Sequence, residues 1–279
     1  MRATGIKAVP TNDWHRATAG GDRDLLHLAT RRALAAGAKR QTLVFIVTSP
    51  RPQVGKTFVA RVLIDFLRLD RDDPVVFDLN PSGDALKDYL PHLAVTADIG
   101  DIKGQMALFD SLVVDDGAAK VVDLSNACFE RFFAIMEEIS FTKEALRRSI
   151  EPVILYVADP HPIAVRAYAD LQRRFGSAVL VPVFNEAILK GRRLREQFPF
   201  SRAAAVPLHI PALAPLLKAQ LDKPSCSFVD VHDRLPMAIP VGLAVELRSW
   251  TRRTFVEFRE LELRILLEQL RASLPGVKL

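Results

Sequence analysis

Three consecutive residues, Gly55, Lys56 and Thr57, combine a flexible backbone, a positive charge and a hydroxyl group. These groups suit a bound chain of phosphates. Gly55 has no Cβ to prevent a close approach to the backbone, Lys56 can reach the β- and γ-phosphates, and the Thr57 hydroxyl can ligate Mg²⁺. Backbone N–H groups at a helix start form a cradle for such an anion. We assign the next residue, Phe58, to the same binding segment.

The flanking sequence supports this interpretation. Residues 43–47 are apolar and rich in β-branched side chains, the run is broken by prolines at 50 and 52, and residues 58–69 have helical periodicity. Strand, loop and helix are the context that a P-loop requires. The usual motif begins with glycine seven residues before its final Ser or Thr, whereas this chain has Pro50 there. The alternative is a strand-to-helix turn that carries Gly-Lys-Thr by chance.

Acidic residues end several apolar runs and are candidates for holding the metal of a bound nucleotide. Asp123 lies in the short run 120–124, and Asp78 and Asp159 follow or end similar runs. Ligands collect at the carboxyl ends of parallel strands, so all three could face one crevice. We rank Asp123 first as the Mg²⁺ ligand, Asp78 second, and place Asp159 near the rim.

The remaining periodicity predicts alternating strands and helices. Such alternation is typical of a doubly wound, mostly parallel α/β sheet in three layers, a P-loop NTPase or Rossmann-like fold, here with a C-terminal helical extension. We predict a flexible basic arm over 1–21, an NTPase domain over 22–240 and a C-terminal helix over 241–279 that packs on the domain or extends from it. Strands are expected at 42–48, 75–79, 120–124, 152–158 and 178–184, a last strand within 203–217, and helices at 22–38, 55–69, 82–89, 126–139, 143–149, 163–175 and 241–274; residues 91–106 receive no assignment, and 109–114 fit a short helix or a strand.

Composition narrows the class further. The chain has 279 residues, of which 49% are hydrophobic, and two cysteines without a Cys-x-x-Cys pair. A disulfide framework or a zinc site is therefore not expected, and a reducing cytoplasm fits. We expect neither a signal peptide nor a transmembrane helix. The net charge is +5, and the first forty residues, with eight Lys or Arg and three Asp or Glu, account for all of it. Such an arm is either a solvated end or a contact for an anionic partner.

The order of these segments resembles the ParA/MinD group of P-loop ATPases over roughly residues 40–215. The similarity rests on the P-loop, on FDLNPSG at 77–83, on VVDL at 121–124, on LYVADPHPIAVRAYADLQRRF at 155–175 and on VLVPVFNEA at 179–187. The resemblance implies ATP and Mg²⁺ as cofactors, Lys56 at the phosphates, and Thr57 and Asp123 at the metal. It matches Asn185 to the residue that reads adenine.

Two departures from that family pattern concern catalysis. Arg51 stands at the position of the family's signature lysine, which reaches the partner subunit's phosphates, and Asn80 replaces the second aspartate after strand two. Arg51 can bind phosphate through two parallel hydrogen bonds. Asn80 can orient a water molecule but cannot accept its proton, so hydrolysis is expected to be slow or absent. The resemblance thus places Lys56, Asp78, Arg51 and Asn80 in the catalytic set.

The resemblance implies a homodimer that forms on ATP binding and is released by hydrolysis. Such a dimer positions or partitions a cargo, which is a plasmid, a chromosome or a protein assembly. An adaptor or cargo protein is then expected as its partner. Two alternatives stay open: a degenerate P-loop scaffold that binds partners but scarcely hydrolyses nucleotide, and an ATP-dependent carboxylate-activating enzyme of the dethiobiotin or cobyrinate synthase type. Non-specific DNA is a further candidate partner, through the basic residues Lys190, Arg192, Arg193 and Arg195, which a solvated helix face explains equally well.

Overall fold

The computed structural model describes residues 41–70, 73–80, 85–192, 194–222, 228 and 240–273. Gln41–Leu279 form one compact unit. The arm expected over 1–21 and the helix expected over 22–38 lie outside the described residues. The described residues therefore include most of the α/β domain and the C-terminal helix, but not the basic arm.

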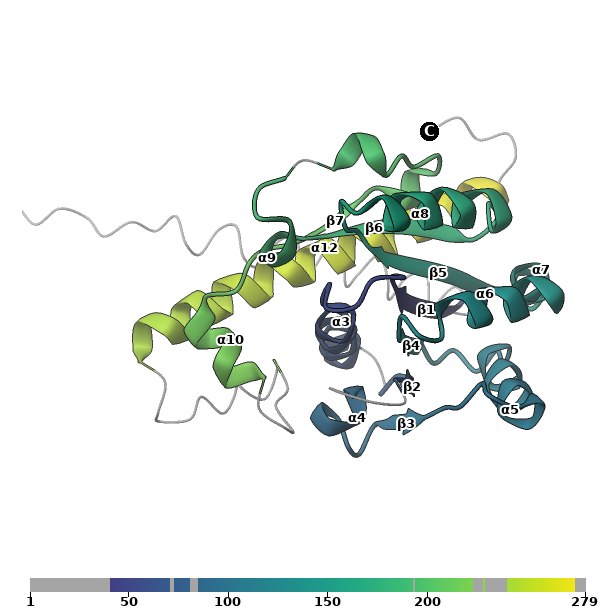
Figure 1. Cartoon of the computed structure of the whole chain (residues 1–279), viewed down its shortest axis with the longest axis horizontal. Helices are drawn as coiled ribbons and strands as arrows, with labels where there is room; N and C mark the ends of the chain where they lie inside the picture. The colour runs from purple at the N-terminus through teal and green to yellow at the C-terminus, as the bar shows by residue number, and fades with distance from the viewer. Residues whose placement is uncertain are drawn as a thin grey trace, which may run out of the picture. The chain divides into compact units, whose positions relative to one another are not determined.

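A seven-stranded, wholly parallel sheet forms the centre of the described chain (Figure 1). Its spatial order is β3-β2-β4-β1-β5-β6-β7. The predicted doubly wound α/β fold is confirmed. The strands are β1 (Thr42–Thr48), β2 (Val75–Leu79), β3 (Ala94–Thr96), β4 (Lys120–Leu124), β5 (Ile150–Val157), β6 (Val179–Asn185) and β7 (Leu208–Ile210).

Helices cover both faces of the sheet, which makes the architecture three-layered (Figure 1). One face packs against α3 (Lys56–Asp70), α4 (Leu86–Tyr89), α10 (Pro215–Leu221) and α12 (Val241–Ser273). The other packs against α5 (Ile102–Leu112), α6 (Phe129–Glu138), α7 (Phe141–Arg147) and α8 (Pro162–Arg174). The short α9 (Glu186–Leu189) and the 3₁₀ turns η1 (Arg195–Gln197) and η2 (Ala203–Ala205) follow β6.

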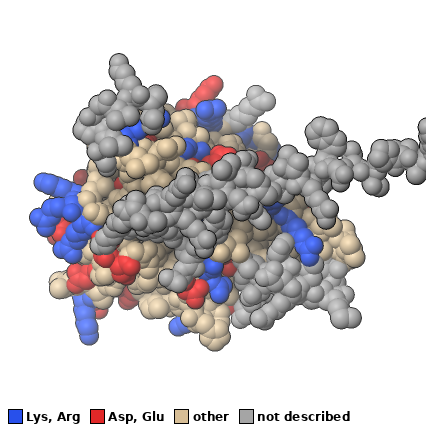
Figure 2. Space-filling view, turned by 180° about the vertical axis from the view of Figure 1, so that it is seen from behind, with Lys and Arg blue, Asp and Glu red and all other residues tan. Residues whose placement is uncertain are grey.

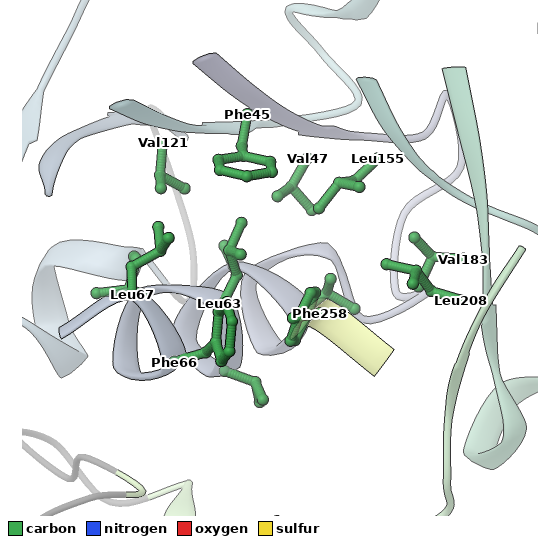
Figure 3. Packing of buried hydrophobic residues seen from close by; sticks show 14 of the residues in the cluster. Phe45, Val47, Leu63, Phe66, Leu67, Val121, Leu155, Val183, Leu208 and Phe258 are labelled. Atoms are coloured by element: carbon green, nitrogen blue, oxygen red, sulfur yellow. The ribbon is translucent and has the colours of Figure 1, made fainter. Parts of the chain in front are cut away.

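Side chains of the central strands alternate between two apolar cores because successive residues of a strand point to opposite faces. In β1, Phe45 and Val47 enter the core beneath α3, whereas Val44 and Ile46 enter the core beneath α6 and α8. Figure 3 shows Phe45 and Val47 lying above Leu63 of α3 in the first of these cores. Burial on both faces explains why the strands read as continuous apolar runs.

Residues 91–106, which received no assignment, contain β3 and the start of α5. Ala94 of β3 pairs with Val76 of β2, so β3 forms one edge of the sheet. The Asp101 side chain accepts a hydrogen bond from the Gly104 backbone N–H and starts α5, which ends at Leu112. Residues 109–112 are thus the last turn of this helix. A three-residue strand and a helix with an internal glycine give little periodicity, which explains the missing assignment.

The C-terminal helix α12 packs on the domain along the face that contains α3. Leu247, Trp250, Phe258, Leu261 and Ile265 are buried in the same core as β1. These positions recur every three, four or seven to eight residues, as a helical packing face requires.

Polar contacts also attach α12 near its C-terminal end. The Arg202 guanidinium lies 2.8 Å from the Glu268 carboxylate and 3.4 Å from that of Glu151. Among the helices that the structure describes, none is long and apolar enough to cross a membrane.

Candidate functional site

The predicted P-loop connects β1 to α3 at the carboxyl edge of the sheet. Gln53 and Gly55 both have positive φ, 58° and 91°, so the loop turns sharply twice. Alternating backbone conformations of this kind direct successive N–H groups into one concave surface that attracts anions. The Gly55 carbonyl accepts from the Val59 N–H and starts α3, whose first N–H groups have no partner within the helix. These features, with Pro50 and Pro52 in the same loop, are the ones that an anion-binding turn at a helix start requires.

The Lys56 side chain crosses this loop. Its Nζ atom donates to the Arg51 carbonyl oxygen at 2.7 Å, and only 8% of the residue is exposed. Burial lowers the pKa of the ammonium group, while the nearby Asp123 carboxylate partly raises it again. A weakly solvated cation binds an anion more strongly than a surface lysine would, because water screens it less.

Thr57 and Asp123 meet beside the lysine. The Thr57 hydroxyl lies close enough to the Asp123 carboxylate to lower the pKa of that group. Strand β4 makes this possible, since it lies directly against β1 with Asp123 paired to Val47. The two residues that the sequence suggests as metal ligands, Thr57 and Asp123, therefore lie at the same edge of the sheet.

The Asp123 carboxyl group is fully enclosed, and one of its atoms lacks a partner. Burial and the neighbouring Asp78 raise its pKa to about 7, against the opposing effects of the Thr57 hydroxyl and Lys56. Within the part of the chain that the structure describes, its Oδ2 atom accepts no hydrogen bond. A buried oxygen without a donor fits a site for a cation. Hard oxygen ligands of this kind suit Mg²⁺, so Thr57 and Asp123 fit the metal of a bound nucleotide.

Asp78 lies beside Asp123 but has a different environment. The two residues are paired across β2 and β4. The Asp78 oxygens accept 3.0 Å hydrogen bonds from the backbone N–H groups of Asn80 and Lys87, and that of Leu86 also contributes. The Asp78 carboxylate therefore joins the end of β2 to the start of α4. This structural role was not predicted, and it leaves the carboxylate less suited than Asp123 to bind a metal.

Replacing Asp78 with alanine is expected to destabilise the fold. Each of these bonds to a charged, buried acceptor contributes about 1.5 kcal/mol, so we expect a loss of roughly 3 kcal/mol in the free energy of unfolding, measured by urea denaturation. Asp78→Asn keeps one acceptor oxygen and removes a charge that burial disfavours, since burial raises the pKa of Asp78, so it should lose much less than Asp78→Ala. If Asp78→Ala unfolds like the unchanged protein, the carboxylate does not hold this junction.

Arg51 and Asn80 lie at the same edge as the P-loop. The Arg51 Nε atom is 3.9 Å from Asp159 Oδ1, an ion-pair contact with the segment after β5. Asp159 also accepts from the His161 N–H at 2.8 Å and begins the turn into α8. The sequence placed Asp159 near the rim but gave no sign of its contact with Arg51. The Asn80 backbone N–H is bonded to Asp78, as described above.

Two further candidates have contacts that sequence reasoning did not foresee. The Phe58 ring lies 5.6 Å from that of Phe228 and 5.7 Å from that of Trp250, so it packs against the apolar core. The Asn185 side chain donates from Nδ2 to the Val54 carbonyl oxygen at 3.1 Å. Asn185 thus lies against the P-loop itself, 131 residues away in sequence.

The basic segment after β6 has little helix. Lys190 and Gly191 both have positive φ and end α9, Arg192 is exposed, and Arg195 begins a short 3₁₀ turn. Arg193 lies outside the described residues. The described part of this segment therefore does not form a continuous basic helix face.

Other basic residues gather elsewhere on the surface. Figure 2 shows Lys and Arg side chains at one edge of the rear face, with Asp and Glu side chains close to them. Helix α7, at the corresponding edge in Figure 1, carries exposed Arg147 and Arg148, which both pair with Glu144. Mixed charges of this kind attract a polyanion only weakly, because the positive and negative potentials partly cancel.

The chain matches no protein-family model and no curated protein sequence. Fold and site geometry are therefore the basis on which its function is argued.

Proposed function

We propose that this chain binds ATP with Mg²⁺ at the P-loop and acts as a ParA/MinD-like switch, a homodimer in the nucleotide-bound state that positions or partitions a cargo in the cytoplasm. One observation carries the proposal: Lys56, Thr57 and Asp123 converge at the end of β1 because the strand that bears Asp123 is the immediate neighbour of the P-loop strand. A strand-to-helix turn carrying Gly-Lys-Thr by chance would not need a buried carboxylate beside its threonine.

Each residue has a distinct task in this proposal. The backbone N–H groups from Val54 to Phe58 bind the phosphate oxygens, and Lys56 exchanges its bond to the Arg51 carbonyl for one to the terminal phosphates. Thr57 and Asp123 hold the cation, which when bound neutralises charge on the phosphates. Arg51, at the rim of the loop, can leave Asp159 for a phosphate of the partner subunit, since the pair is long at 3.9 Å.

Slow hydrolysis is part of the proposal. Asp78 is engaged by backbone N–H groups, and Asn80 offers an amide where a base would need a carboxylate. A protein that binds ATP tightly and hydrolyses it slowly stays in its dimeric state for longer. The same observation favours the second candidate, a scaffold that binds nucleotide and scarcely hydrolyses it.

Sedimentation velocity with and without ATP and Mg²⁺ tests the switch. Because nucleotide would bind better to the dimer than to the monomer, ATP with Mg²⁺ should move most of the protein from a species of about 31 kDa to one of twice that mass. ADP should leave the monomer predominant. A single mass under all conditions, with ATP bound by calorimetry, would favour the scaffold, and absence of ATP binding would refute both.

A further inference from the structure

We infer that Asn185 braces the P-loop in its phosphate-binding shape and does not read the base. This inference deepens the proposed function, on which it rests. It differs from the adenine-reading role that the family resemblance implies for Asn185.

Both ends of the Asn185 amide are engaged by backbone. Nδ2 donates to the Val54 carbonyl oxygen at 3.1 Å, and Oδ1 accepts from the Ala187 N–H at 3.3 Å. A carbonyl requires a donor and an N–H requires an acceptor, so these partners fix the orientation of the amide. The residue is 4% exposed, and the bond to Val54 is buried. One N–H and one lone pair of the amide remain, but with 4% of the residue exposed they have little access to an adenine ring.

Contact with Gly55 makes the brace specific to this loop. A Cβ atom on Gly55 would lie 2.5 Å from Asn185 Nδ2, closer than real side chains approach. The φ of Gly55 is +91°, which also disfavours other residues. The amide therefore occupies the space under the sharpest turn of the loop and holds the Val54 carbonyl away from the phosphates.

Strand β6 supplies the rigidity. Asn185 is the last residue of β6, where it pairs with Ile210 of β7, and its Oδ1 starts α9. The amide thus connects the P-loop to the β6 end of the sheet. A loop fixed from outside loses less freedom when phosphate binds, and affinity rises accordingly.

The affinities of Asn185→Ala for three ligands distinguish the two roles, support of the P-loop and recognition of the base. Titration calorimetry would compare ATP, GTP and inorganic tripolyphosphate, each with Mg²⁺. Loss of the brace should weaken all three by a similar factor, about tenfold if one buried hydrogen bond is involved, and leave the preference for ATP over GTP unchanged. Loss of that preference with unchanged tripolyphosphate affinity would overturn the inference. Glu186→Ala, an exposed neighbour, is the matched control and should change nothing.

A double-mutant cycle without ligand tests the brace even if no nucleotide binds. Gly55→Ala should destabilise the protein much less when Asn185 is alanine, because the clash with Nδ2 is removed while the φ strain is common to both backgrounds. The expected result is a clear coupling in urea denaturation midpoints. Additive effects would show that the amide does not press on this turn. If the wild-type chain binds none of the three ligands but the coupling is found, the proposed function fails and the brace stands as a structural feature.

Discussion

Lys56→Ala is expected to abolish measurable ATP binding and, with it, the ATP-dependent dimer. The ammonium group is weakly solvated and lies within the P-loop, where it bonds to the Arg51 carbonyl oxygen. Two or more charge-assisted bonds to phosphate would contribute about 1.5 to 3 kcal/mol each, so we expect affinity to fall by roughly 100-fold or more. Titration calorimetry measures the affinity, and sedimentation velocity the dimer.

The matched control for this prediction is Lys87→Ala. Lys87 is exposed on α4, and it contacts Asp78 through its backbone and not its side chain. It should bind ATP like the unchanged protein. ATP affinity of Lys56→Ala within a factor of about three of the wild type, less than 1 kcal/mol, would rule out the P-loop as the phosphate site.

Asp123→Asn is expected to remove the Mg²⁺ dependence of ATP binding and at the same time to stabilise the ligand-free protein. The carboxylate is buried without enough donors, which raises its pKa from an ordinary 3.8 to about 7. That rise corresponds to roughly 4 kcal/mol against the ionised form. A neutral amide avoids part of this cost, so we expect a gain of roughly 2 kcal/mol in the free energy of unfolding at pH 8.

The gain in unfolding free energy from Asp123→Asn should increase as pH rises. Between pH 4 and 7 the folded chain keeps a proton on Asp123 that the unfolded chain has released, so this group's contribution to stability is lost as pH rises. The difference between wild type and Asp123→Asn should therefore be small at pH 4 and largest above pH 7. Urea denaturation across this range measures it. A difference that is constant with pH would contradict the raised pKa.

Asp116→Asn is an informative comparison because its expected effect on stability at neutral pH is opposite to that of Asp123→Asn. Asp116 pairs with Lys120 at 2.9 Å, and this contact, with backbone N–H groups, lowers its pKa. Removing its charge should reduce stability at neutral pH and have less effect in acid. Parallel pH curves for the two variants would indicate a general charge effect instead of the two local environments.

Much of the fold could be predicted because strands that are buried on both faces of the sheet appear in the sequence as apolar runs. The runs 42–48, 75–79 and 120–124 are mostly apolar, and all three are strands. Thr57 and Asp123 could be paired in advance, since both follow or end such runs. The order of strands is not written in any local pattern, so the direct contact of β4 with β1 had to be observed.

What could not be predicted consists of contacts between distant segments. Arg51 with Asp159 joins positions more than a hundred residues apart, and Asn185 with Val54 joins positions 131 apart. Periodicity reports on burial along one element and carries no information about such partners. The bonds from Asp78 to the start of α4 could not be predicted for a related reason, because an acidic strand end looks the same in sequence whether it binds a metal or accepts from the next helix.

The distance in sequence between Val54 and Asn185 has a consequence for how the protein is made. Strand β1 lies between β4 and β5, and the ribosome makes both of these strands after β1. The Asn185 amide, which lies against the P-loop, is made after all three strands. At translation rates of about 5 to 20 residues per second, the loop waits on the order of ten seconds for its support. Nascent chains that stop before β6 should therefore fail to retain nucleotide, so ligand capture would mark the moment at which β6 joins the sheet.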